Sequence, residues 1–167
     1  LFYLKQIVTF DFGRSFSTNQ KISTLIWDGV GPSLTLTIPI FLIDLVVAIG
    51  IALVAAYKRN TLLDRSSVVL AVVGMSVSSL VYILAGQYLP AYKFGWFPIW
   101  GFESAKYLFL PVLIGVISGL GGGVRFYRTV MLDEMYQDYV RTAFAKGHAE
   151  RTVLFRHVLK NAMIPIL

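Results

Sequence analysis

Few residues in this chain of 167 could do chemistry. The candidates are Asp44, a single carboxylate inside a long apolar stretch, and two histidines, His148 and His157. The chain has no cysteine, so it offers no thiolate nucleophile, disulfide or thiolate metal ligand. It also has no H-E-x-x-H zinc motif, no G-x-S-x-G nucleophile turn and no G-x-x-x-x-G-K-[ST] loop for nucleotide phosphates. We therefore expect a protein that is not an enzyme and that holds no metal or cofactor in this chain.

Asp44 has two interpretations, and both stay open at this point. An ionisable side chain in an apolar segment is costly, so it usually faces a cavity or a partner group. Asp44 could line a translocation path or carry a proton. It could equally be a polar contact to another helix or to another subunit. The histidines fall in a basic segment, and we interpret them as loop or interface residues rather than ligands.

The elements that position these residues must be membrane helices. Hydrophobic residues make up 56% of the chain and charged residues 14%, with a mean hydropathy of +0.69. Soluble domains usually carry about 25% charged residues. A chain with so little polar surface cannot cover a globular core in water, and we expect an all-α membrane protein.

Three apolar stretches are long enough to be membrane spans, at about 33–57, 67–89 and 107–124. A helix over the first would be about 37 Å long, enough to cross a hydrocarbon layer of about 30 Å with some tilt. An aromatic loop follows the second span, as is typical of a membrane–water interface. A further span begins at 158–167.

The distribution of positive charge predicts the orientation. Residues 58–66 together with 125–160 contain ten Lys and Arg, whereas residues 1–30 together with 90–106 contain five. Because Lys and Arg collect in cytoplasmic loops, the first group should lie in the cytoplasm. The segment 1–30 should then be extracytoplasmic.

Three glycines, Gly115, Gly119 and Gly123, are spaced four apart in the third span. At this spacing they share one helix face and could let two membrane helices pack closely. The alternative is that glycine is simply common in membrane helices.

The segment after the third span predicts two short helices in a cytoplasmic loop at about 129–157. Apolar residues recur with helical spacing from 135 to 144, and the opposite face is polar. Gly147 should end this helix, as glycine does at the C′ position. A second helix should start near 149–150. Such a pair could lie on the lipid surface or dock onto a cytoplasmic partner.

The same segment carries a family resemblance. Residues 139–147 (YVRTAFAKG), followed by 156–165 (RHVLKNAMIP), resemble the cytoplasmic loop of the oligopeptide/dipeptide/nickel permease family. Residues 11–15 (DFGRS) and 62–65 (LLDR) are similar to other parts of that family. The resemblance implies a fragment of a MetI-like ABC importer bundle, with one partial transmembrane permease domain over residues 1–167. One span would precede residue 1 and two would lie near or after residue 167.

In this family the loop is called the EAA motif and forms a coupling helix that sits in a cleft of the ATPase subunit. By position, Arg141, Thr142 and Ala143 stand where the motif has Glu-Ala-Ala, and Gly147 is its glycine. The chain has Leu159-Lys160 where the motif often closes with Leu-Pro. The resemblance thus implies an ATPase-coupling loop made of Tyr139, Arg141, Thr142, Ala143, Ala145, Lys146 and Gly147.

The resemblance also implies the partners and the location. They are a homologous permease subunit, two cytoplasmic ATPases that bind ATP and Mg, an extracytoplasmic solute-binding protein and the lipid of a bacterial inner membrane, with no nucleic acid. The solute would be a peptide or a similar small molecule. Two other hypotheses stay open, namely a secondary transporter coupled to protons through Asp44 and a membrane anchor that binds a cytoplasmic protein.

Overall fold

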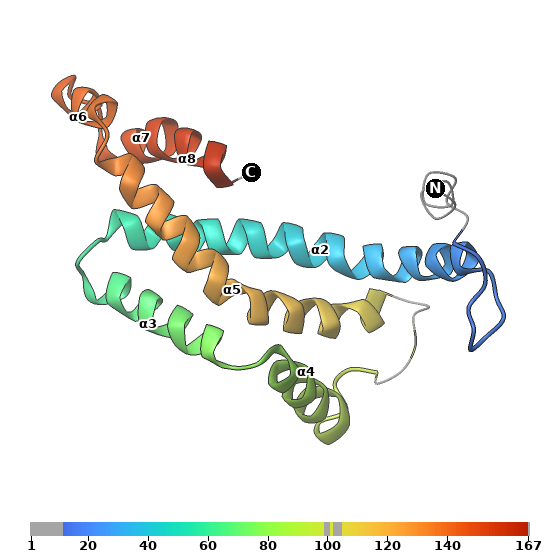
Figure 1. Cartoon of the computed structure of the whole chain (residues 1–167). Coiled ribbons are helices and arrows are strands. Elements are labelled where there is room, and N and C mark those ends of the chain that lie inside the picture. The colour runs from blue at the N-terminus through green and yellow to red at the C-terminus, as the bar shows by residue number, and fades with distance from the viewer. Residues whose placement is uncertain (1–11, 99–100, 102–104, 167) are drawn as a thin grey trace. The chain divides into compact units, whose positions relative to one another are not determined.

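The computed structural model of the chain describes residues 12–98, 101 and 105–166, and within them every regular element is a helix. The prediction of an all-α protein is therefore confirmed (Figure 1). The first part of the predicted extracytoplasmic segment, up to residue 11, lies outside the described residues. In chain order the helices are α2 (Ile22–Tyr57), α3 (Leu62–Ser76), α4 (Ser79–Gln87), the π-helix η1 (Tyr88–Lys93), α5 (Ala105–Met135), α6 (Asp138–Ala145), α7 (Glu150–Val153), the π-helix η2 (Leu154–Val158) and α8 (Leu159–Ile166).

The chain divides into two compact units, residues 1–39 and 40–167. In the first unit a short turn precedes α2, and an isolated antiparallel bridge joins Arg14 to Lys21. The α2 segment of this unit contains Pro32 and Pro39. The Thr35 hydroxyl donates to the carbonyl of Pro32 at 2.8 Å, a bond from a threonine side chain back to the preceding turn of its helix.

The second unit contains the rest of α2 and all the other helices. Its α3 and α4 correspond to the predicted span at 67–89, but the two helical segments are bent by 88° at a short break. Val77 is extended, and the Ser78 side chain caps α4 by accepting from the Leu80 N–H at 3.4 Å. The Tyr82 hydroxyl donates to the carbonyl of Gly74 at 3.0 Å, a carbonyl near the end of α3 that also accepts the Val77 N–H at 3.4 Å.

Two described helices, Ile22–Tyr57 and Lys106–Met135, are long and apolar enough to cross a membrane. The bent pair Leu62–Ser76 and Ser79–Lys93 adds a third crossing if it counts as one broken span. The three predicted span ranges and the loop boundaries stay predictions. Many large apolar side chains of these helices are exposed, including Leu70 and Leu80, as expected for surfaces that meet lipid or other helices.

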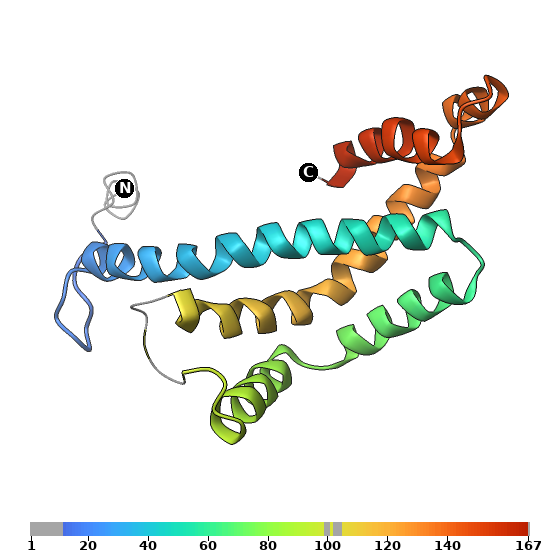
Figure 2. The same cartoon turned by 180° about the vertical axis from the view of Figure 1, so that it is seen from behind.

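Helices α3 and α4 lie along α5, and α6, α7 and α8 gather at the end of α5 where α2 ends and α3 begins (Figures 1 and 2). A core that we call the base cluster fills this end. It joins the last turns of α2 to α5 and to everything that follows. Its buried members are Ala52, Leu53, Ala56, Met131, Val140, Ala143, Val153, Leu154, Val158 and Ala162.

Candidate functional site

Helix α6 is short and has two different faces. Val140 and Ala143 are buried in the base cluster. On the other face Arg141, Thr142 and Lys146 are exposed, and so is the large apolar side chain of Phe144. The outer face therefore includes an arginine and an exposed aromatic ring, residue types that are enriched at protein–protein interfaces.

Gly147 ends α6 with a specific geometry. Its φ of +80° is the left-handed conformation that glycine adopts without a steric penalty. The Gly147 N–H donates to the carbonyl of Phe144 at 2.9 Å, and the His148 N–H donates to that of Ala143 at 3.3 Å. These two bonds form a Schellman motif, which satisfies the last carbonyls of a helix. The sequence prediction that the helix stops at Gly147 is confirmed.

The base cluster connects the buried face of α6 to α2 and α5 through apolar side chains in contact. Val140 and Ala143 of α6 belong to the same buried cluster as Met131 of α5 and Ala52 of α2. Close-packed interiors transmit displacement because they have low compressibility. Val140 and Ala143 thus attach α6 to α2 and α5 through one continuous core.

Tyr139 connects α6 to the end of α5 by a polar contact. Its hydroxyl donates to the Glu134 carboxylate, Oε2. Burial raises the pKa of Tyr139 above its ordinary value of 10.0, and the bond to Glu134 raises it further, whereas a hydrogen bond with Asn161 lowers it. The hydroxyl thus stays neutral and keeps its proton for Glu134.

The structure brings the predicted coupling residues together on one small element, but their side chains do not form one surface. Arg141, Thr142, Ala145 and Lys146 are exposed, whereas Ala143 is buried and Tyr139 is half-buried. Arg141 lies 3.7 Å from the Asp138 carboxylate in an exposed pair, which contributes little to stability. The predicted loop therefore combines an outer face with an inner attachment.

The predicted glycine face lies against α2. A Cβ atom on Gly115 would stand 2.6 Å from the Ile40 side chain, and one on Gly123 would stand 3.0 Å from the Cβ of Ala48. Between them, a Cβ on Gly119 would stand 3.2 Å from Asp44 Oδ1. Each glycine thus meets one residue of a matching i, i+4, i+8 row on α2.

Asp44 is consequently at a helix–helix contact. Its Oδ1 is buried, and among the described residues no donor reaches it. The side chain as a whole is half-buried. Its position in a translocation path stays a prediction.

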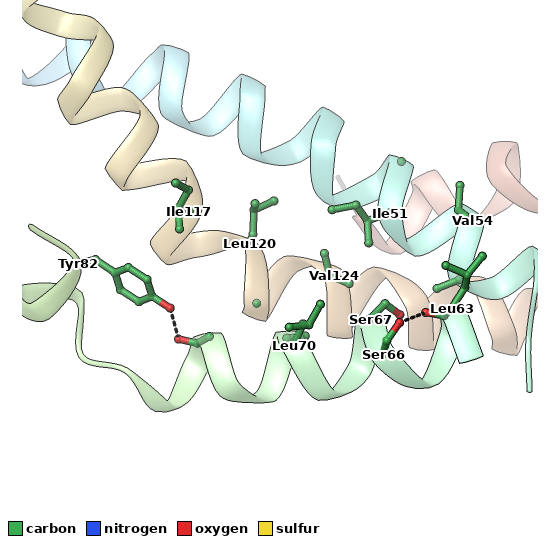
Figure 3. Close-up of a pocket in the computed structure, with 15 residues that line it drawn as sticks. Ile51, Val54, Leu63, Ser66, Ser67, Leu70, Tyr82, Ile117, Leu120 and Val124 are labelled. Carbon is green, nitrogen blue, oxygen red and sulfur yellow. Dashed lines mark hydrogen bonds between the residues drawn. The ribbon is translucent and has the colours of Figure 1, made fainter. Parts of the chain in front are cut away.

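A groove of about 570 Å³ lies between α2, α3 and α5 in the second unit (Figure 3). Its walls are mostly aliphatic, and Tyr82 lies at one end (Figure 3). The Ser66 and Ser67 hydroxyls donate to the backbone carbonyls of Leu63 and Asp64. Because none of its lining residues is charged, the groove offers no ion-pair partner for a charged solute.

One polar contact at this end of the molecule was not predicted from the sequence. Asp64 at the start of α3 and Arg128 in α5 form an ion pair with an Nε–Oδ1 distance of 2.6 Å, in which Asp64 is buried and Arg128 is half-buried. The available signal was a lone acid in 62–65 and a basic residue at the end of the third span, both on the predicted cytoplasmic side. Their separation of 64 positions gives no local pattern to connect them.

The two histidines lie near one another at the end of α6. The rings of His148 and His157 lie 6.0 Å apart, just beyond α6. Across the described ranges no group of three or more His, Cys, Asp or Glu side chains is arranged to hold a metal ion.

Comparison with known proteins gives a consistent result. Residues 48–167 match the family described as "Binding-protein-dependent transport system inner membrane component". The chain is 30% identical to a dipeptide transport system permease protein, DppB, of Alkalihalophilus pseudofirmus, covering 99% of this chain and 58% of the relative. It is 34% identical to a putative peptide permease protein of Brucella suis, covering 100% and 56%. It is 30% identical to the dipeptide transport system permease protein DppB of Bacillus subtilis, covering 100% and 54%. The chain therefore spans a little more than half the length of these relatives.

Proposed function

Because the chain belongs to the family of inner membrane components of binding-protein-dependent transport systems, within its peptide permeases, we propose that it couples ATP hydrolysis on a partner to solute uptake. The proposed solutes are peptides or similar small molecules, following the names of the relatives. The chain belongs to a transport family rather than to a family of enzymes, so the chemistry would occur on the partner ATPase, with its ATP and Mg.

The observation that carries this proposal is the construction of α6. Its exposed face presents Arg141, Phe144 and Lys146, and its buried face is part of the core that contains α2 and α5. A docking helix of this kind needs both a free outer face and a rigid attachment to the helices it moves. ATP-driven movement of the partner would shift α6, and the packed base cluster would pass the shift to the long helices.

The complete transporter would contain this subunit, a homologous permease, two cytoplasmic ATPases and an extracytoplasmic solute-binding protein in a bacterial inner membrane. A two-state helix bundle of this kind needs no catalytic residue in the membrane. Selection of the solute would depend largely on the binding protein.

Uptake by the full-length permease, reconstituted with all its partner subunits, tests the proposal. We expect peptide uptake that requires ATP and persists when the proton gradient is collapsed. Uptake that follows the proton gradient and ignores ATP would exclude this function. Cross-linking of a cysteine placed at Phe144 to the ATPase is the matching structural test, and Phe155, exposed outside α6, is the control position.

The proton-coupled alternative has one observation in its favour, the buried Asp44 Oδ1 that finds no donor among the described residues. Asp44→Asn removes the titratable group with little change in volume. Under the proposed function this variant keeps ATP-driven uptake. In a proton-coupled carrier the same variant would abolish transport driven by the proton gradient. The anchor hypothesis predicts instead that no variant of α6 changes uptake.

A further inference from the structure

The carboxylate of Asp64 is the one buried charged side chain among the residues that the structure describes, with 3% of its surface exposed. It is at the start of α3, next to the turn that connects α2 to α3. Both of its oxygens bind Arg128 of α5, Oδ1 through Nε at 2.6 Å and Oδ2 through Nη2 at 2.9 Å. This two-point geometry fixes orientation as well as distance.

The same carboxylate also holds the turn between α2 and α3. Its Oδ2 accepts the backbone N–H of Asn60 at 3.0 Å. Asn60 has a φ of +62°, the left-handed conformation that reverses the chain here. The Thr61 hydroxyl donates to the carbonyl of Lys58 at 2.6 Å and closes the turn. Asp64 therefore binds the conformationally restricted residue of the turn and a side chain of α5 at once.

A second contact joins the turn to the residues after α5. The guanidinium carbon of Arg59 lies 5.5 Å from the centre of the Tyr136 ring, within the range of a cation–π contact. Tyr136 precedes α6 by two residues. The turn is thus attached on both sides of Met131, the α5 residue that is fully buried in the base cluster.

We propose that Asp64 and Arg128 are positioning residues that bind the α2–α3 turn to the end of α5, so that the turn and α6 move as one body. This inference rests on the proposed coupling function of α6. The pair suits such a role because separating it would leave a buried charge without a partner, which is strongly unfavourable. The turn therefore stays attached when α5 moves, and the displacement of α6 reaches α3 as well as α2 and α5.

The first test measures solute transported per ATP hydrolysed, for each assembled complex of the full-length protein. Asp64→Asn keeps the side-chain size and the acceptor for Asn60 but removes the charge. We expect a loss in this ratio of about tenfold, the middle of the range for residues that connect coupled sites. Arg128→Lys keeps the charge but cannot bind both carboxylate oxygens. We expect this variant to lower the transport ratio less than Asp64→Asn does.

Matched controls lie beside each residue. Arg65→Gln and Arg125→Gln remove exposed charges one residue after Asp64 and three residues before Arg128. Both controls should keep the wild-type ratio. A purely structural pair would lower the amount of assembled complex and leave the ratio per complex unchanged, and that outcome would overturn the inference.

A second measurement needs no transport. Spin labels at two exposed positions, Leu62 in α3 and Gln137 before α6, report the distance between the turn and α6. In the wild type we expect one narrow distance distribution in the presence and absence of ATP. In Asp64→Asn we expect a broad one. A narrow distribution that Asp64→Asn leaves unchanged would overturn the inference even if uptake proved independent of ATP, a result that would separately exclude the proposed function.

Discussion

A Cβ atom on Gly121 of α5 would stand 2.6 Å from the carbonyl oxygen of Ala71 in α3. The backbones of α5 and α3 approach so closely here that there is no room for a side chain at Gly121. The next residue, Gly122, has no described atom within 4 Å of such a Cβ. Packing against α3 therefore requires a glycine at Gly121, whereas nothing described requires one at Gly122.

The first prediction compares these two glycines. Gly122→Ala should stabilise the protein, because alanine favours a helix over glycine by roughly 1 kcal/mol. Gly121→Ala should destabilise it by about 1–3 kcal/mol, because the added methyl group meets backbone that cannot move aside. Thermal unfolding of the purified full-length permease in detergent measures both. Equal shifts in Tm would show that α3 and α5 are not in close contact at Gly121.

The second prediction compares two alanines of α6. Ala143 is 4% exposed, whereas Ala145 is exposed. Ala143→Leu should destabilise the base cluster by about 1–3 kcal/mol, since a well-packed core has no space for three more carbons. Ala145→Leu should change stability by less than about 0.5 kcal/mol. Denaturant unfolding compares the two, and a tolerated leucine at Ala143 would contradict the packing described for α6.

The third prediction concerns the end of α6. Gly147 has open space around it, so a side chain there meets no atom, but its φ of +80° strains any residue with a Cβ. Gly147→Val should cost about 1–2 kcal/mol and displace the Schellman turn, and we expect it to lower ATP-coupled uptake.

Gly147→Asn is the control for that variant, because asparagine tolerates the left-handed conformation better than other residues do. It should keep most of the uptake, and both proteins should insert into the membrane equally well. Equal uptake by the valine and asparagine variants would show that the left-handed backbone conformation at Gly147 does not affect uptake.

The fourth prediction concerns the pH dependence of stability. Burial raises the pKa of Tyr139 above 10.0, so the folded protein disfavours the phenolate more than the unfolded chain does. The neutral hydroxyl therefore makes its full contribution to the free energy of unfolding below pH 10. This contribution is lost as the pH rises from 10 towards the higher pKa of the folded protein. Tyr139→Phe should remove this part of the pH dependence.

The measurement is the difference in Tm between wild type and Tyr139→Phe from pH 8 to 11. At pH 8 the variant should be less stable by about 1–3 kcal/mol, because Glu134 loses its hydroxyl donor. The difference should shrink as the pH rises above 10. A constant difference across the range would mean that the Tyr139 hydroxyl does not titrate differently in the folded protein.

Periodicity and composition predicted the helical class because each depends on near neighbours in the sequence. The end of α6 at Gly147 followed from the conformational freedom of glycine, a property of one residue. The glycine spacing at 115, 119 and 123 indicated a packing face, but its partner row on α2 could not be identified. That row contains Asp44 and was hidden among many apolar residues with the same spacing.

Two features were not predictable from the sequence, one local and one that joins distant parts of the chain. The 88° bend between α3 and α4 falls inside an apolar range whose two halves look alike, and only the Ser78 cap and the Tyr82 hydroxyl mark it. The Asp64–Arg128 pair joins residues 64 positions apart, and no local pattern distinguishes a paired acid from a solvated one.

The base cluster has a consequence for biosynthesis. Ala56 leaves the ribosome long before Ala162, yet both are fully buried in the same core. Until the later helices are synthesised, the small apolar side chains at the C-terminal end of α2, such as Ala52 and Ala56, have no packing partners from α8. The packed attachment of α6 is therefore among the last parts of this region to form, and a chain whose synthesis stops before α8 leaves the base cluster without Ala162.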